Sequence, residues 1–166
     1  ALKGLHWLKR NTWTGSKKNV KAHYDLGNQL FQTFLDPTLM YSSALFTDKT
    51  TDLHEASKEK LDHICRKLHL SQNDHVLEIG TGWGGFAVHA AVHYGCKITT
   101  TTISEEQYEH TSQLVENMGL KDKITVLKKD YRDLEGEFDK IVSIEMIEAV
   151  GHHFLDTYIN LSLIHI

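Results

Sequence analysis

The chain has 166 residues, 40% of them hydrophobic, which is enough for one domain with a substantial core but short of a complete large enzyme. Its formal net charge of -4 and pI near 6.3 give no basic footprint, so we expect no nucleic-acid partner. No apolar run reaches the roughly 18 residues that a membrane-spanning helix needs, so any membrane contact should be peripheral.

The cysteines and histidines carry little sign of a site. Cys65 and Cys96 have apolar neighbours, which favours buried free thiols over a disulfide and fits a cytoplasmic protein. The twelve histidines are scattered along the chain, and we expect no metal site.

The N-terminal third is expected to be helical. From Val20 to Leu35, apolar residues recur at helical spacing with an interruption at 25–28, which predicts two short helices. A loop follows around Asp36, and its segment 40–46 is unusually aromatic and apolar, as in loops that line pockets. Asp52 is then expected to cap a helix with an apolar stripe from Leu53 to Leu68.

From His75 onward, strand and helix patterns alternate. The predicted elements are a strand to Ile79, a helix from Trp83 to about Tyr94, a strand at 97–102, a helix at 104–118 and strands at 123–127 and 138–144. This alternation predicts an open, mostly parallel α/β sheet, with Ser104 and Gln107 forming a capping box. A ligand should lie at the carboxyl ends of the strands, near Gly80 to Gly82, Thr102 and Asp130.

The segment 76–86 is the most informative, because a buried strand leads into a glycine-dense turn that opens a helix. Gly80, Gly82 and Gly85 match the dinucleotide pattern G-x-G-x-x-G, but the acidic residue expected about twenty positions later is missing. Glu78 instead suits a ligand with an ammonium group, such as the methionyl end of S-adenosylmethionine. The alternative is an ordinary strand-to-helix turn.

The last six residues, 161–166, are what CTG TCT CTT ATA CAC ATC encodes, a transposon end used in preparing sequencing libraries. We expect them to be a sequencing artefact, with the natural sequence continuing differently after Asn160.

The chain from about Asn11 to Asn160 resembles the cyclopropane-fatty-acyl-phospholipid synthases, relatives of the mycolic acid cyclopropane synthases. The resemblance is carried by blocks of residues at 23–28, 40–44, 77–85, 102–107 and 144–152. It implies a Rossmann-like class I methyltransferase fold, incomplete at its C-terminus. Residues 1–70 would form a helical lid segment and 71–160 the first half of the cofactor-binding domain.

The resemblance also implies a cofactor site for S-adenosylmethionine. Glu78, Gly80 and Gly82 would approach its methionyl part, with Tyr41 and Ser42 closing over it. Thr102 and Gln107 would reach the adenosine, and Asp130 and Tyr131 would flank the adenine.

The implied chemistry is methyl transfer to an alkene, which creates a carbocation that must be stabilised and then lose a proton. In the family a bound bicarbonate is thought to act as the base, and here it would be held by Glu148 and by the backbone N–H of Ser43. The chain departs from the family at Ser43, where many members have cysteine, and at Glu145, where several have glycine. The product can be a ring or a methyl branch.

The expected substrate is an acyl chain of a membrane phospholipid. Its pocket would be lined by Tyr24, Phe31, Phe34 and Leu45, and a basic pair at Lys17-Lys18 would contact the inner face of the cell membrane. The alternatives are N-methylation of a small amine and a non-catalytic fragment that binds S-adenosylmethionine. A homodimer is compatible with these expectations.

Overall fold

The computed structural model describes residues 31, 33–49 and 51–164. The expected helices between Val20 and Leu35 lie almost wholly outside these residues, as do Tyr24 and Lys17-Lys18.

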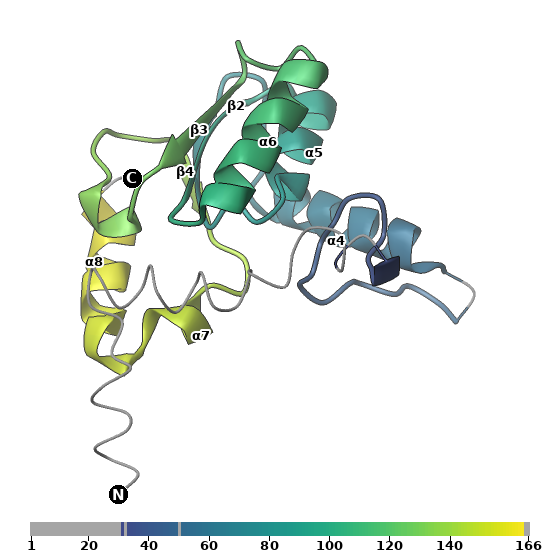
Figure 1. The fold of residues 1–166 in the computed structure, drawn as a ribbon, viewed down its shortest axis with the longest axis horizontal. Coiled ribbons are helices and arrows are strands. Elements are labelled where there is room, and N and C mark those ends of the chain that lie inside the picture. Colours follow the sequence, from purple (N-terminus) through teal and green to yellow (C-terminus); the bar gives the residue numbers. More distant parts are fainter. Residues whose placement is uncertain (1–30, 32, 50, 165–166) are drawn as a thin grey trace, which may run out of the picture.

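A parallel sheet of four strands forms the centre of the fold (Figure 1). The strands are β1 (His75–Ile79), β2 (Lys97–Thr102), β3 (Ile124–Lys128) and β4 (Lys140–Val142), in the order β3-β2-β1-β4. The predicted α/β class is therefore confirmed.

The strand expected at 138–144 is shorter at both ends. Phe138 packs its ring edge-on against His75, with centroids 4.8 Å apart, so its side chain belongs to the core beside the sheet. After the strand, the hydroxyl of Ser143 donates to the carbonyl of Ile79, 2.9 Å away. This contact ties the segment after β4 to the end of β1.

Helices cover both faces of the sheet (Figure 1). One face carries α4 (Leu53–Lys67), α5 (Gly85–Tyr94) and α6 (Glu105–Asn117), and the other carries η1 (Tyr131–Asp133), α7 (Ile147–Val150), η2 (His152–Phe154) and α8 (Leu155–Ile164). Successive side chains of β1 point to opposite faces of the sheet, so the core has two parts. Val76 packs with the first group of helices, and Leu77 packs with the second.

Both predicted helix caps are present. The Asp52 carboxylate accepts the N–H of Glu55 at 2.8 Å, and the Ser104 hydroxyl accepts the N–H of Gln107 at 3.3 Å. The Gln107 side chain does not reach back to Ser104, as a full capping box requires, but bonds to Thr102. It is thus held at the carboxyl end of β2.

Strand β2 buries four consecutive threonines, and each hydroxyl has a partner. Thr99 pairs with His75 Nε2 at 2.9 Å, Thr100 donates to Glu78 at 2.6 Å, Thr101 donates to the carbonyl of Lys129 at 2.6 Å, and Thr102 donates to Gln107 at 2.8 Å. A polar strand is tolerated at the centre of the sheet because these bonds replace the lost water.

The thiols of Cys65 and Cys96 are buried and free, as predicted, and burial raises the pKa of Cys65 to about 12. The histidines are less scattered than expected: His89 and His93 stand one turn apart on α5, with ring centroids 4.5 Å apart. In the part of the chain that the structure describes, no three potential ligands gather around a common point, and no helix is long and apolar enough to cross a membrane.

Candidate cofactor site

The glycine loop lies at the switch point of the sheet, where β1 has β2 on one side and β4 on the other. Gly80 and Gly82 have φ of +100° and +53°, a backbone conformation that a side chain would strain. The N–H groups of Gly80 and Thr81 donate to the carbonyl of Thr101, which fixes the start of the loop. The N–H of Gly82 has no hydrogen-bond partner among the described residues, so it is available to a ligand.

Tyr41 covers this loop. A Cβ placed on Gly82 would lie 3.4 Å from the Tyr41 ring, and the Tyr41 hydroxyl is 3.5 Å from the Gln107 side-chain amide, which donates to it. Gln107 in turn accepts from Thr102 at 2.8 Å. Four residues expected at the cofactor therefore meet at one edge of the sheet, although they come from segments far apart in the sequence.

Glu78 lies beneath the loop and is 3% exposed. Burial raises the pKa of Glu78 to about 8, against the opposing effect of the hydrogen bond from Thr100. Burial thus favours the uncharged form of this side chain. A cation placed close by would favour the ionised form, which suits the ammonium group expected from the sequence.

Asp130 follows β3 at the same edge, where its carboxylate is bound by Arg132. The guanidinium donates from Nε at 2.8 Å and from Nη2 at 2.6 Å, and both side chains are about nine-tenths buried or more. Tyr131 packs edge-on against Tyr158, with centroids 5.4 Å apart. Arg132 was not predicted from the sequence, because its position in the sequence does not distinguish an arginine that is buried against a carboxylate from one on the surface.

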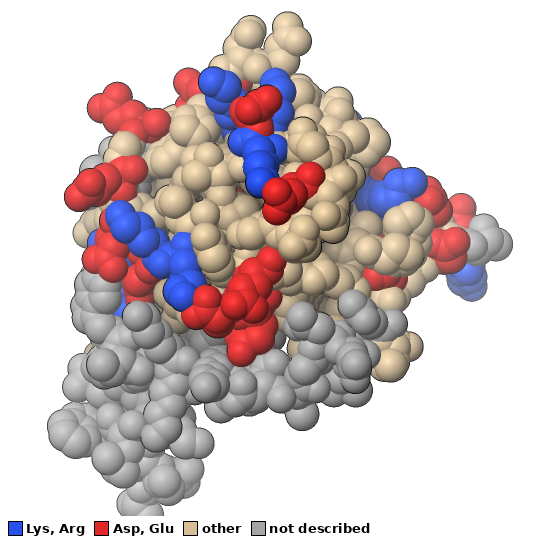
Figure 2. Space-filling view, turned by 45° about the horizontal axis from the view of Figure 1, so that its top comes forward, with Lys and Arg blue, Asp and Glu red and all other residues tan. Residues whose placement is uncertain are grey.

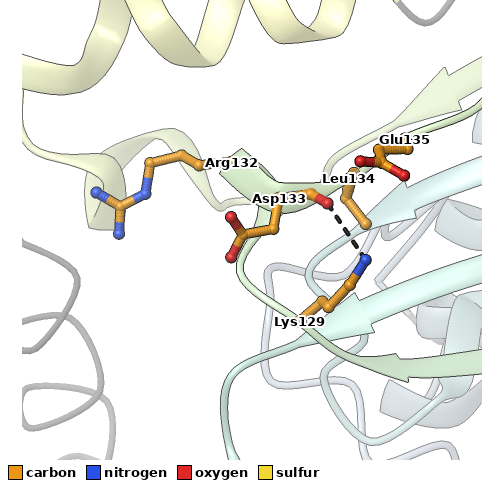
Figure 3. A pocket seen from close by; sticks show the side chains of 5 residues that line it. All are labelled: Lys129, Arg132, Asp133, Leu134 and Glu135. Atoms are coloured by element: carbon orange, nitrogen blue, oxygen red, sulfur yellow. Dashed lines mark hydrogen bonds between the residues drawn. The ribbon is translucent and has the colours of Figure 1, made fainter.

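Arg132 also lines a surface hollow of about 470 Å³. Figure 3 shows the side chains around it. The hollow is lined by Lys129, Arg132, Asp133, Leu134 and Glu135, and Lys129 donates to the backbone carbonyl of Asp133 at 3.4 Å. None of the residues expected at the cofactor lines it. We therefore place the candidate site at the glycine loop and not in this hollow.

The two expected catalytic residues have different surroundings in the structure. Glu148 is exposed on the short helix α7, whereas Ser43 bonds to Glu145. Glu145 Oε1 accepts the backbone N–H of Ser43 at 2.9 Å and its hydroxyl at 2.8 Å. In the sequence, Glu145 stands out only as a position where the chain departs from the family it resembles. Its contact with Ser43 joins residues 102 positions apart, so no local pattern predicts it.

The aromatic residues expected to line the acyl pocket divide into two groups. Phe31 lies within the site, with ring centroids 6.3 Å from Tyr41 and 5.7 Å from Trp83. Phe34 contacts Phe31 but is 57% exposed, and Leu45 is 38% exposed. Trp83 is a buried site residue that the sequence reasoning placed only as the start of a helix.

The chain is similar in sequence to known proteins. The sequence profile of the mycolic acid cyclopropane synthetase family matches residues 12–164. A probable fatty acid methyltransferase of Pseudomonas putida is 43% identical over 141 residues, covering 84% of this chain and 36% of that protein. The cyclopropane-fatty-acyl-phospholipid synthase of Escherichia coli strain K12 is 44% identical over 138 residues, covering 83% of this chain and 35% of its own length.

Solved structures show the same likeness. The mycolic acid cyclopropane synthase CmaA1, complexed with SAH and CTAB, matches with a TM-score of 0.87 and 35% identity over 90% of this chain and 53% of that one. The cyclopropane synthase MmaA2 from Mycobacterium tuberculosis matches with a TM-score of 0.82 and 33% identity over 86% of this chain and 50% of its own. The chain spans about a third to a half of these relatives and has the methyltransferase α/β fold. It belongs to the mycolic acid cyclopropane synthetase family.

Proposed function

We propose that the chain is part of an S-adenosylmethionine-dependent C-methyltransferase that adds a methylene or methyl group at a cis double bond of phospholipid acyl chains. The observation that carries the proposal is the meeting of Tyr41, Gly82 and Gln107 above the buried Glu78. The names of the relatives, a fatty acid methyltransferase and a cyclopropane-fatty-acyl-phospholipid synthase, support the substrate class.

The residues present fit S-adenosylmethionine. A backbone without side chains at Gly80 and Gly82 admits close approach of a ligand, and Glu78 offers a carboxylate to an ammonium group. Thr102 and Gln107 offer hydroxyl and amide groups, and Asp130, next to Tyr131, follows the neighbouring strand β3. When bound, the cofactor supplies an electrophilic methyl group.

The chain's own residues would orient the reaction and exclude water from it. Tyr41, with Ser42 next to it, lies on a segment that covers the glycine loop, and this segment would act as part of a lid. Phe31 and Phe34 extend an apolar surface from Tyr41 for an acyl chain, with Leu45 further along the lid. Glu148 is exposed near the end of β4, where its charge can stabilise a developing positive charge.

The residues at Ser43 do not fit the bicarbonate that the resemblance implies. The N–H and hydroxyl that would hold it are both bonded to Glu145. We therefore derive no step through bicarbonate.

Contact with the membrane surface is part of the proposal, because the substrate lies in a bilayer. On the face that Figure 2 shows, basic and acidic side chains alternate and no broad basic surface forms. The proposed contact is the basic pair Lys17-Lys18, which lies outside the described residues.

Transfer of an isotope-labelled methyl group by the full-length gene product tests the function. We expect label in unsaturated phospholipids and none in small amines offered as competing acceptors. Label in the amines would favour the N-methyltransferase alternative, and cofactor binding without transfer would leave a binding protein.

A further inference from the structure

Glu145 makes a polar contact that the proposed function does not use. Glu145 follows β4 and has φ of +49°, in the left-handed region that residues with a Cβ rarely adopt. Its side chain is exposed, so core packing does not hold it there. A strained backbone at such a position needs a compensating interaction, and strain of this kind is concentrated at functional sites.

The compensating interaction is with Ser43. Both hydrogen bonds from Ser43 end on Oε1 of Glu145, at 2.9 and 2.8 Å, and are strengthened because the acceptor is a carboxylate. The other oxygen, Oε2, has no hydrogen-bond partner among the described residues. One oxygen thus anchors the side chain, and the second is available as a proton acceptor.

The anchored carboxylate stands beside the cofactor loop. Met146, the next residue, has its sulfur 3.6 Å from a Cβ placed on Gly80. On the other side, Ser43 is two residues from Tyr41, which covers Gly82. Glu145 therefore joins the lid segment to the carboxyl end of β1, where the methyl donor is proposed to bind.

A half-buried cation lies close to this contact. Lys60 of α4 donates to the hydroxyl of Ser42. Burial lowers the pKa of Lys60, while the nearby carboxylates of Glu145 and Asp36 act in the opposite direction. The donors of Ser43 together with Lys60 thus favour an anion at this position, and Glu145 supplies it from within the chain.

We propose that Glu145 fills an anion site on Ser43 and serves as the general base of the reaction, so that no exogenous bicarbonate is needed there. The inference rests on the proposed function. After methyl transfer leaves a carbocation, a C–H bond of the new methyl group breaks and its electron pair forms the C–C bond that closes the ring. The proton passes to Oε2 of Glu145 and then to water, so charge and atoms balance.

Three forms of the full-length protein give distinct expectations with and without added bicarbonate. Wild type should turn over without it. Glu145→Gln keeps an oxygen acceptor for Ser43 but is not a base, so turnover should fall about 10²–10⁴-fold and not recover with bicarbonate. Glu145→Gly empties the site, so its turnover should fall similarly and recover when bicarbonate is added. Affinity for S-adenosylhomocysteine should change less than threefold in Glu145→Gln.

Thermal unfolding gives a readout that does not depend on turnover. Bicarbonate should raise the melting temperature of Glu145→Gly and leave that of wild type unchanged, because only the emptied site binds it. His69→Gly is the matched control. His69 has the same φ of +49° but lies between α4 and the start of β1, so the substitution relieves similar strain without touching Ser43.

These experiments distinguish failure of the base proposal from failure of the proposed function. Wild-type activity that requires bicarbonate, full activity of Glu145→Gln, or a Glu145→Gly variant that bicarbonate neither stabilises nor rescues would each overturn the inference while leaving methyl transfer intact. If the wild-type protein transferred no methyl group to lipid, the proposed function would be overturned, and so would the role of Glu145 as its base. If bicarbonate raised the melting temperatures of His69→Gly and Glu145→Gly equally, the effect would not be specific to Ser43, and this result would also refute the site.

Discussion

Replacing Glu78 by glutamine should remove a large part of the pH dependence of stability. The pKa of this carboxyl rises from 4.5 to about 8 on folding because the group is completely buried. The folded protein therefore keeps a proton that the unfolded chain releases. The contribution to stability is fully present below about pH 4.5 and is lost as the pH rises toward 8.

The slope follows from proton linkage. Between these two pKa values one proton separates the states, so wild type should lose about 1.4 kcal/mol of unfolding free energy per pH unit relative to Glu78→Gln. Urea unfolding of both proteins at several pH values between about 5 and 7.5 measures the difference, and groups common to both cancel. Parallel pH profiles would show that Glu78 is not a buried neutral acid.

Further substitutions test the other parts of the site. Gly82→Val should weaken S-adenosylhomocysteine binding at least tenfold by calorimetry, because φ of +53° strains any residue with a side chain and the branched side chain would extend from a Cβ already 3.4 Å from the Tyr41 ring; wild-type affinity would remove the loop from the site. Glu148→Gln should lower turnover by about 10²-fold or more with nearly unchanged cofactor affinity, because its charge stabilises the developing positive charge, whereas equal losses in both would place Glu148 at the cofactor. Arg132→Ala should cost about 3–5 kcal/mol in urea unfolding because it leaves the Asp130 carboxylate buried without its partner, and adding Asp130→Asn should recover part of that loss; a surface-like loss below 1 kcal/mol would contradict this. The full-length protein should float with anionic liposomes that carry unsaturated chains, and absence of binding would count against membrane contact.

The fold was predictable wherever a local sequence pattern was compatible with only one secondary-structure element. Strand β2 begins and ends at the predicted residues, and the caps at Asp52 and Ser104 are formed by the side chains expected. The switch-point rule brought Gly80 and Thr102 to one edge because parallel strands share their carboxyl ends. Periodicity and capping chemistry act over a few residues and can be read directly.

The contacts that give the site its character act over longer distances. The bond between Ser43 and Glu145 joins residues 102 positions apart, and it depends on a left-handed backbone that no sequence pattern signals. Arg132 pairs with Asp130 only because the turn after β3 buries both side chains. The spacing of His89 and His93 was readable and was missed, although no third ligand joins them among the described residues.

The central claim is that S-adenosylmethionine binds between the glycine loop and Tyr41, and a crystal structure of the full-length protein with S-adenosylhomocysteine tests it most directly. The account predicts the ligand's amino-acid end against the backbone of Gly80 to Gly82, on the Glu78 side of the loop, with Tyr41 closed over it and the adenosine toward Thr102 and Gln107. A ligand bound elsewhere, for example in the hollow lined by Lys129 and Glu135, would contradict it.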